Sequence, residues 1–124
     1  MQISSNNGAR NRLFGVLGGL SGALGMVAYA GAAHGGGAYL GTIAPLLLGH
    51  APVLLVLSLI APGNRAAQIG GALIIVGLVL FCGDLEMRDL NGDRLFPFAA
   101  PTGGTAMILG WLSVALAGFF PHKK

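Results

Sequence analysis

Residues 38–61 read AYLGTIAPLLLGHAPVLLVLSLIA. This run contains no Asp, Glu, Lys or Arg, and His50 is its one histidine. A helix needs roughly 17–25 predominantly apolar residues to cross the hydrocarbon core of a bilayer. Backbone polar groups in lipid must bond to one another, so a continuous apolar run of this length predicts a transmembrane α-helix.

Three more stretches have the same character, at residues 13–33, 66–83 and 101–120. None of them alternates apolar and polar residues with a period of two, which argues against a membrane β-barrel. We therefore predict an all-α bundle of four transmembrane helices in a single membrane domain covering residues 1–124. The polar segments outside the helices are an N-terminal tail, residues 1–12, and an acidic loop, residues 84–98.

The composition independently favours a lipid environment. Hydrophobic residues make up 54% of the chain, charged residues only 9%, and the mean hydropathy is +0.75. Soluble domains carry roughly a quarter charged residues. A small compact particle with so few polar groups could not cover its surface in water. The 22 glycines fit the same picture, because small residues let membrane helices approach closely.

The basic residues indicate an orientation rather than a nucleic-acid partner. They are scattered among separate loops and tails instead of being gathered on one face with stacking aromatics. With four spans, both termini share a side with the second loop, and that side holds most of the basic residues: Arg10, Arg12, Arg65, Lys123 and Lys124. The other side holds only Arg88 and Arg94. The positive-inside rule therefore predicts that both termini are cytoplasmic.

The first apolar stretch has an alternative interpretation as a secretory signal peptide. Arg10 and Arg12 precede an apolar core, and residues 28–30, Ala-Tyr-Ala, resemble a small-residue cleavage site. We expect the segment to be retained as a membrane helix.

Small residues recur at a spacing of four in two of the predicted helices. The first helix contains the pairs Gly15/Gly19 and Gly18/Gly22, and the fourth contains Ala106/Gly110. Such pairs remove side-chain bulk from one helix face and permit close backbone contact. These faces either pack within the bundle or dock a partner protein.

His50 is the first candidate for an intramembrane polar site, because an ionisable group at membrane depth is a functional candidate by default. Pro45 and Pro52 flank it. Because proline has no backbone N–H, carbonyls near Gly41 and Leu48 are expected to lack their usual helical hydrogen bond. A neutral imidazole could bond one of these carbonyls, or a hydroxyl on another helix, in a structural role. The functional alternatives are a quinone contact, a proton relay or an axial haem ligand. His34 lies too far along the first helix to share a metal with it.

Asp84 is the second candidate, since it directly follows the third apolar run. It could bond free amides at the start of the fourth helix, pair with Arg88 or Arg94, or mark the membrane boundary. The stretch 89–93, DLNGD, lacks the ligand spacing of a calcium loop and is better interpreted as a turn.

No residues form a pattern typical of catalysis or cofactor binding. The single cysteine, Cys82, excludes an internal disulfide and any cysteine-based metal cluster. There is no phosphate-binding GxxxxGK[ST] loop and no defensible Ser/His/Asp or Cys/His arrangement. We expect no metal site, no cofactor, no catalytic residues and no enzymatic activity.

Several motifs resemble the domain-of-unknown-function 423 family of small bacterial inner-membrane proteins, related to eukaryotic transmembrane protein 256. Residues 80–85, LFCGDL, resemble the family's "lFsGSLy" stretch. Residues 101–106, PTGGTA, with Gly-Trp at 110–111, resemble its "tPvGGvsfl.GW" motif. Residues 31–34, GAAH, and His50 resemble its first and second helices. The resemblance implies a four-helix protein of the bacterial inner membrane and supplies no activity.

The short loops, the glycine-rich faces and the lack of a catalytic set favour a non-catalytic interaction protein. We expect an accessory or structural subunit of a larger membrane complex, with a respiratory complex as one conceivable host. Its partners would be the lipid bilayer and other membrane-protein subunits, without nucleic acid. The alternative is a small transporter or channel component that uses His50 in the proline-broken second helix.

Overall fold

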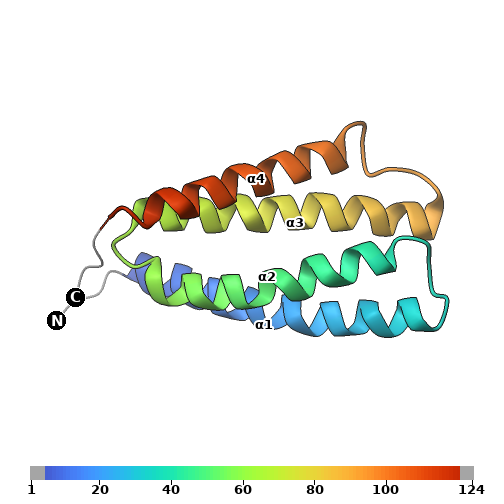
Figure 1. The fold of residues 1–124 in the computed structure, drawn as a ribbon, viewed down its shortest axis with the longest axis horizontal. Coiled ribbons are helices and arrows are strands. Elements are labelled where there is room, and N and C mark those ends of the chain that lie inside the picture. The colour runs from blue at the N-terminus through green and yellow to red at the C-terminus, as the bar shows by residue number, and fades with distance from the viewer. Residues whose placement is uncertain (1–4, 121–124) are drawn as a thin grey trace.

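The computed structural model describes residues 5–120, with the backbone alone for residues 5–10. Four helices make up almost all of this part of the chain (Figure 1). They are α1 (Ser5–Ala33), α2 (Leu40–Ile60), α3 (Arg65–Asn91) and α4 (Ala99–Ala117). All four are long and apolar enough to cross a membrane. The predicted all-α, four-helix membrane bundle is confirmed.

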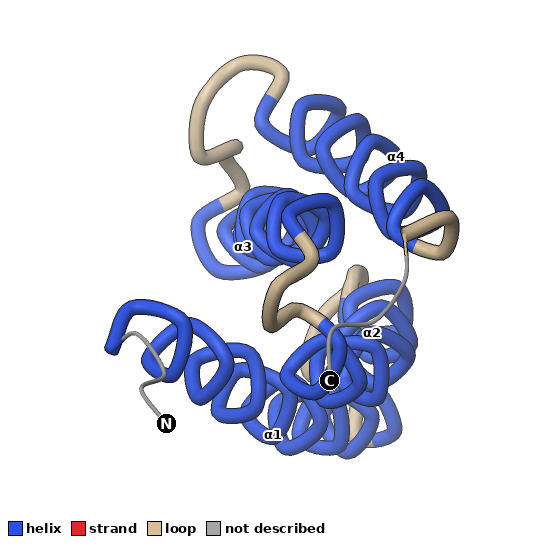
Figure 2. Tube along the Cα trace, turned by 90° about the vertical axis from the view of Figure 1, so that its left-hand side faces the viewer, coloured by secondary structure: helices blue, strands red, loops and turns tan. Residues whose placement is uncertain are grey.

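The bundle consists of two helical hairpins. α1 packs along α2 and α3 packs along α4, whereas α2 and α3 share a much smaller contact. Viewed end-on, the α1/α2 pair and the α3/α4 pair are separate layers (Figure 2). Successive helices run in opposite directions, so α1 begins and α4 ends at the same end of the bundle. We call this the terminal end, and the other, which holds the α1–α2 and α3–α4 connections, the loop end.

Glycine ends two of the helices. After α1, Gly35 adopts a left-handed φ of 71°. The amide of Gly36 then donates to Gly31 O over 2.8 Å and that of Gly35 donates to Ala32 O over 3.3 Å, the hydrogen-bond pattern of a Schellman motif. α3 ends in the same left-handed conformation, at Gly92. These glycines stop the helices sharply, because other residues are strained at positive φ.

The α2–α3 connection is held by the side chain of Asn64. Its Oδ1 accepts from the amide of Ala67 over 3.1 Å, which caps the start of α3. Its Nδ2 donates to Ala117 O at the end of α4 over 3.2 Å. One buried amide side chain therefore joins the turn to the last residue of the fourth helix.

The observed helix ends differ from the predicted ones chiefly in α1, α3 and α4. α1 begins at Ser5, inside the predicted polar tail, since extending an existing helix adds one hydrogen bond per residue. α3 continues to Asn91, so residues 84–91 of the predicted acidic loop are helical. α4 begins at Ala99 and ends at Ala117, and Pro101 is its third residue rather than its first. Residues 1–4 of the predicted N-terminal tail, and residues 121–124 at the C-terminus, lie outside the described residues.

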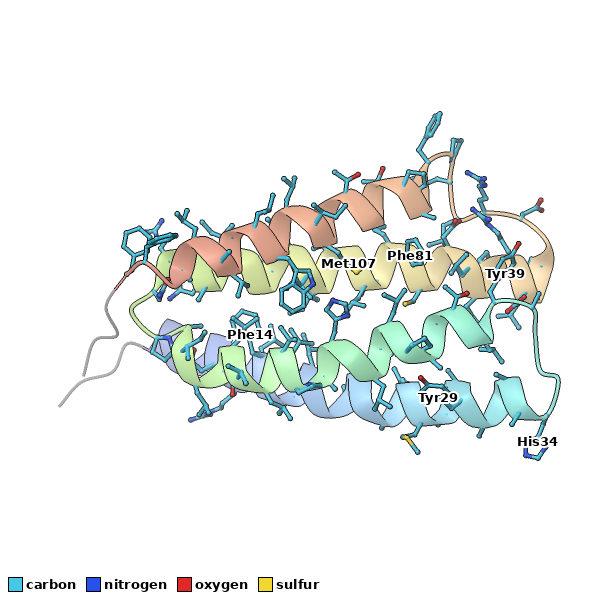
Figure 3. All side chains as sticks on the ribbon, in the orientation of Figure 1. Phe14, Tyr29, His34, Tyr39, Phe81 and Met107 are labelled. Carbon is cyan, nitrogen blue, oxygen red and sulfur yellow. The ribbon has the colours of Figure 1, made fainter. Side chains whose placement is uncertain are left out.

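Large side chains fill the space between the hairpins. Phe14 points into this interior and Met107 packs against Gly77 of α3, whereas His34 points outward at the α1–α2 turn (Figure 3). Leu54, Leu57 and Ile74 are completely buried there. Many other large apolar side chains are exposed, including Leu59 and Phe119. Lipid is the surrounding that makes such exposure favourable, because soluble proteins rarely expose large continuous apolar patches.

Glycines bring α3 and α4 into backbone contact. Gly70 faces Gly110, and Gly77 faces Gly103, so each helix contributes two glycines seven residues apart. A Cβ added at Gly70 would lie 2.8 Å from Gly110 O, and one added at Gly77 would lie 2.6 Å from Gly103 O. We call these four residues the glycine seam. Such close approach permits Cα–H···O contacts and dense packing between membrane helices.

Candidate functional site

His50 lies in the interior of the bundle and uses both ring nitrogens within the protein. It is 9% exposed on α2. Its Nδ1 lies 2.8 Å from Leu46 O, one turn earlier. Its Nε2 accepts a hydrogen bond of 3.0 Å from Nε1 of Trp111 on α4. The two rings lie 5.6 Å apart at an interplanar angle of 55°. His50 therefore joins the two hairpins.

These contacts define the state of the imidazole. The Trp111 indole nitrogen can only donate, and the Leu46 carbonyl can only accept. Nε2 must therefore be the acceptor and Nδ1 must carry the proton, which describes a neutral ring. The bonded carbonyl is that of Leu46, not one near Gly41 or Leu48 as expected from the prolines. The helix itself presents Leu46 O to a side chain four residues on.

Trp111 is the partner that sequence reasoning missed. It had been noted only as part of the Gly-Trp motif, and it lies 61 residues from His50. The tryptophan is partly exposed on α4, so its ring also faces the surroundings of the bundle. An indole N–H in a membrane span needs an acceptor, which is the only hint the sequence offers.

The His50–Trp111 contact should contribute measurable stability. Substituting Trp111→Phe keeps an aromatic ring and removes the donor, while His50→Phe removes the acceptor. Hydrogen bonds between membrane helices contribute roughly 0.6 and up to about 1.7 kcal/mol. We expect an interaction energy in that range from a double-mutant cycle, measured by SDS-induced unfolding in mixed micelles. Strictly additive effects of the two substitutions would show that the contact is not formed.

His34 and His50, the two histidines within the described residues, do not come together. His34 is exposed at the α1–α2 turn, at the loop end of the bundle. Among the described residues, no three His, Cys, Asp or Glu side chains are grouped closely enough to hold a metal ion.

Asp84 is completely buried and uses both carboxylate oxygens. Oδ2 accepts from Arg88 Nη2 over 2.9 Å, as an ion pair one turn apart on α3. Oδ1 accepts from the amide of Leu95 over 2.9 Å. Of the expected partners, Arg88 is the one that the structure pairs with it, and Arg94 is exposed. The bonded amide lies in the α3–α4 loop, not at the start of α4 as expected. The pair explains why the acidic segment remains helical.

Asp89 holds the α2 helix start from the neighbouring hairpin. Its Oδ1 accepts from the amide of Ala38 over 3.0 Å, and its Oδ2 accepts from that of Tyr39 over 3.1 Å. A carboxylate is favourable at a helix N-terminus, where unpaired amides point outward. The Arg88 guanidinium lies 5.8 Å from the centre of the Tyr39 ring. From the sequence, Asp89 was expected only to be part of a turn. Its partners could not be recognised there because they lie about fifty residues away along the chain.

The small-residue faces of α1 divide into used and unused positions. A Cβ at Gly18 would lie 3.1 Å from Ala51 O of α2, and those of Gly15 and Gly22 would contact Ser58 and Ala51. These three glycines pack within the bundle. Gly19 is exposed, and a Cβ there would meet nothing within 4 Å. The outward face of α1 thus keeps a small residue against which no part of the chain within residues 11–120 packs.

On α4, Gly110 belongs to the glycine seam. Its seam partner on the same helix is Gly103, seven residues earlier. Ala106 is partly exposed and lies beside Thr102 and Leu109 at the surface. The spacing of four thus singled out a glycine of the seam, Gly110, and Ala106 lies one turn before it on α4.

A cleft lies between α1 and α3, where the two hairpins do not pack. Its volume is about 520 Å³, and its lining is almost entirely apolar. The polar side chains at its surface are Ser21 of α1 and Glu86 of α3. The Ser21 hydroxyl donates to Leu47 O over 2.6 Å. The Glu86 Oε1 atom is shielded from solvent and accepts no hydrogen bond from the described residues.

These features define a multi-pass, all-α membrane protein whose buried polar groups join two hairpins. The chain belongs to the family described as "Protein of unknown function (DUF423)", whose model matches residues 22–104. It is also similar to the "UPF0382 membrane protein" of Haemophilus influenzae, with 29% identity over 56 residues. That match spans 45% of this chain and 45% of the relative. No solved structure matches significantly.

Proposed function

We propose that the chain is a non-catalytic accessory or structural subunit of a larger membrane assembly. The observation that carries this proposal is the open outward face of α1. Gly19 and Ala23 lie four residues apart there and are both exposed, and none of the described residues lies within 4 Å of a Cβ added at Gly19. Small residues at this spacing allow a second helix to approach closely.

The use of the intramembrane polar groups supports a structural role over transport. A proton relay needs a group that can exchange its proton with neighbours along a path. Both nitrogens of His50 and both oxygens of Asp84 already make bonds within the fold. We therefore favour the accessory role over the transporter alternative.

The proposed location is the bacterial inner membrane, with both termini on the cytoplasmic side. The relative from Haemophilus influenzae is a bacterial protein that is named a membrane protein. The described ends of α1 and α4 lie together at the terminal end of the bundle (Figure 1). Arg65 begins α3 near this end, whereas Arg88 lies near the loop end. The basic residues near the terminal end would therefore face the cytoplasm.

The substitution Gly19→Leu tests the partner face. The side chain has open space on the protein's own surface, so we expect the bundle to remain folded. The added leucine side chain would prevent a partner helix from approaching closely, so we expect the chain to dissociate from its larger complex. The measurement is native electrophoresis of membranes extracted in mild detergent. Gly49→Leu is the matched control, because Gly49 is also exposed, in mid-helix on α2, with nothing within 4 Å.

A complex that survives Gly19→Leu unchanged would remove this face from the proposal. Equal dissociation by both leucine variants would point to a general effect of bulk rather than to α1.

A further inference from the structure

The cleft between α1 and α3 extends along both helices and is also bordered by α2. Along α1 it runs from Leu17 to Gly31, and α3 contributes Ile75, Val79 and Glu86. Its rim side chains Leu24 and Val79 are 55% and 64% exposed. The cleft therefore opens sideways, toward the lipid that surrounds the bundle.

Its dimensions distinguish between a lipid chain and a protein helix. Gly31 follows Leu17 by fourteen residues, which corresponds to a length of about 21 Å along the axis of α1. A volume of about 520 Å³ over that length gives a cross-section of about 25 Å². A helix with its side chains is about 10–12 Å wide, which needs roughly 80–110 Å². A hydrocarbon chain in contact at about 4 Å needs roughly 15–20 Å². The cleft is wide enough to enclose one hydrocarbon chain and too narrow to enclose a helix.

Glu86 supplies the polar end of the cleft. It lines the end near Gly31 and Leu40, beside the α1–α2 turn. The nearby basic side chain on the same helix, Arg88, pairs with Asp84 through Nη2 and lies over the Tyr39 ring, and its Nε donates no hydrogen bond to Glu86 or to any other described residue. A shielded carboxylate oxygen without a donor is unfavourable, and a cationic donor would satisfy it.

We propose that the cleft binds one acyl chain of a phospholipid whose primary ammonium headgroup pairs with Glu86, as in phosphatidylethanolamine. A hydrocarbon chain gains little by leaving the bilayer for an equally apolar cleft. Selectivity must therefore come from the headgroup. An ammonium group donates to the carboxylate, whereas a headgroup without a cation leaves Glu86 unpaired and adds like charge when it is anionic.

Native mass spectrometry of the purified protein tests this assignment. The protein is titrated with phosphatidylethanolamine or with phosphatidylglycerol carrying the same acyl chains. We expect one retained ethanolamine lipid per chain and a preference of about tenfold over the glycerol lipid. Glu86→Gln should abolish the preference. The matched control, Asp93→Asn, removes an exposed acid from the α3–α4 loop and should leave the preference unchanged.

A second variant tests the acyl-chain part of the site. Leu24→Trp adds bulk at the exposed rim and should lower the retention of both lipids, while circular dichroism shows the helix content intact. Equal retention of the two lipids, a preference that survives Glu86→Gln, or a lipid-free dimer that occupies the cleft would each overturn the assignment.

Discussion

The substitution Gly103→Ala should destabilise the bundle by about 1–3 kcal/mol. The added Cβ would lie 2.7 Å from the Phe81 amide nitrogen and 2.8 Å from Gly77 O. Both atoms belong to the backbone of α3, so no side chain can rotate away to make room. The two helices must separate, which loses packing along the whole glycine seam. SDS-induced unfolding followed by circular dichroism measures the effect.

The neighbouring Gly104 provides the matched control. A Cβ there would have only a Phe81 ring carbon nearby, at 3.9 Å, which is ordinary van der Waals contact. Gly104→Ala should therefore be neutral, or stabilising by up to about 1 kcal/mol through helix propensity. Equal effects of the two alanine substitutions would contradict the glycine seam.

Removal of the Asp84 carboxylate should have the largest effect among the polar substitutions. Asp84→Ala removes a completely buried carboxylate and leaves the partly exposed Arg88 guanidinium and the Leu95 amide without their acceptor. A hydrogen bond to a charged group contributes about 1.5–3 kcal/mol. We expect a loss of that order in the free energy of unfolding, measured in detergent by SDS titration. Asp93→Ala, in the exposed part of the same loop, should change stability by less than about 0.5 kcal/mol.

A double substitution separates the ion pair from the general effect of losing a side chain. Asp84→Leu combined with Arg88→Leu removes both charges, so it should cost less than Asp84→Ala alone. If the double variant is the less stable of the two, the Asp84–Arg88 pair does not account for the burial of Asp84.

The fold could be predicted because its main determinant is local. Four apolar runs of sufficient length dictate four helices once the surroundings are lipid, whatever their partners are. The end of α3 was not predictable on this basis, since Asp84 and Arg88 are polar and resemble a loop. They remain helical because each neutralises the other one turn away and Gly92 then ends the helix.

The candidate site could be predicted only in part. His50 and Asp84 stand out because polar residues are rare in apolar runs. The partner Trp111 and the partners of Asp89 depend on how the hairpins meet, and the partner Leu95 depends on the path of the α3–α4 loop; the sequence displays neither. The glycines show the same division. Small residues on α4 recur both four and seven residues apart. The antiparallel packing of α4 against α3 determines that Gly103 and Gly110 are the two that contact the other helix.

The proposed accessory role is tested most directly by the composition of the native particle. The measurement is mild-detergent extraction of native membranes, native electrophoresis and mass spectrometry of the band that contains this chain. We predict co-migration with a defined larger complex at fixed stoichiometry. Migration of the chain alone, or only with copies of itself, would contradict the accessory role.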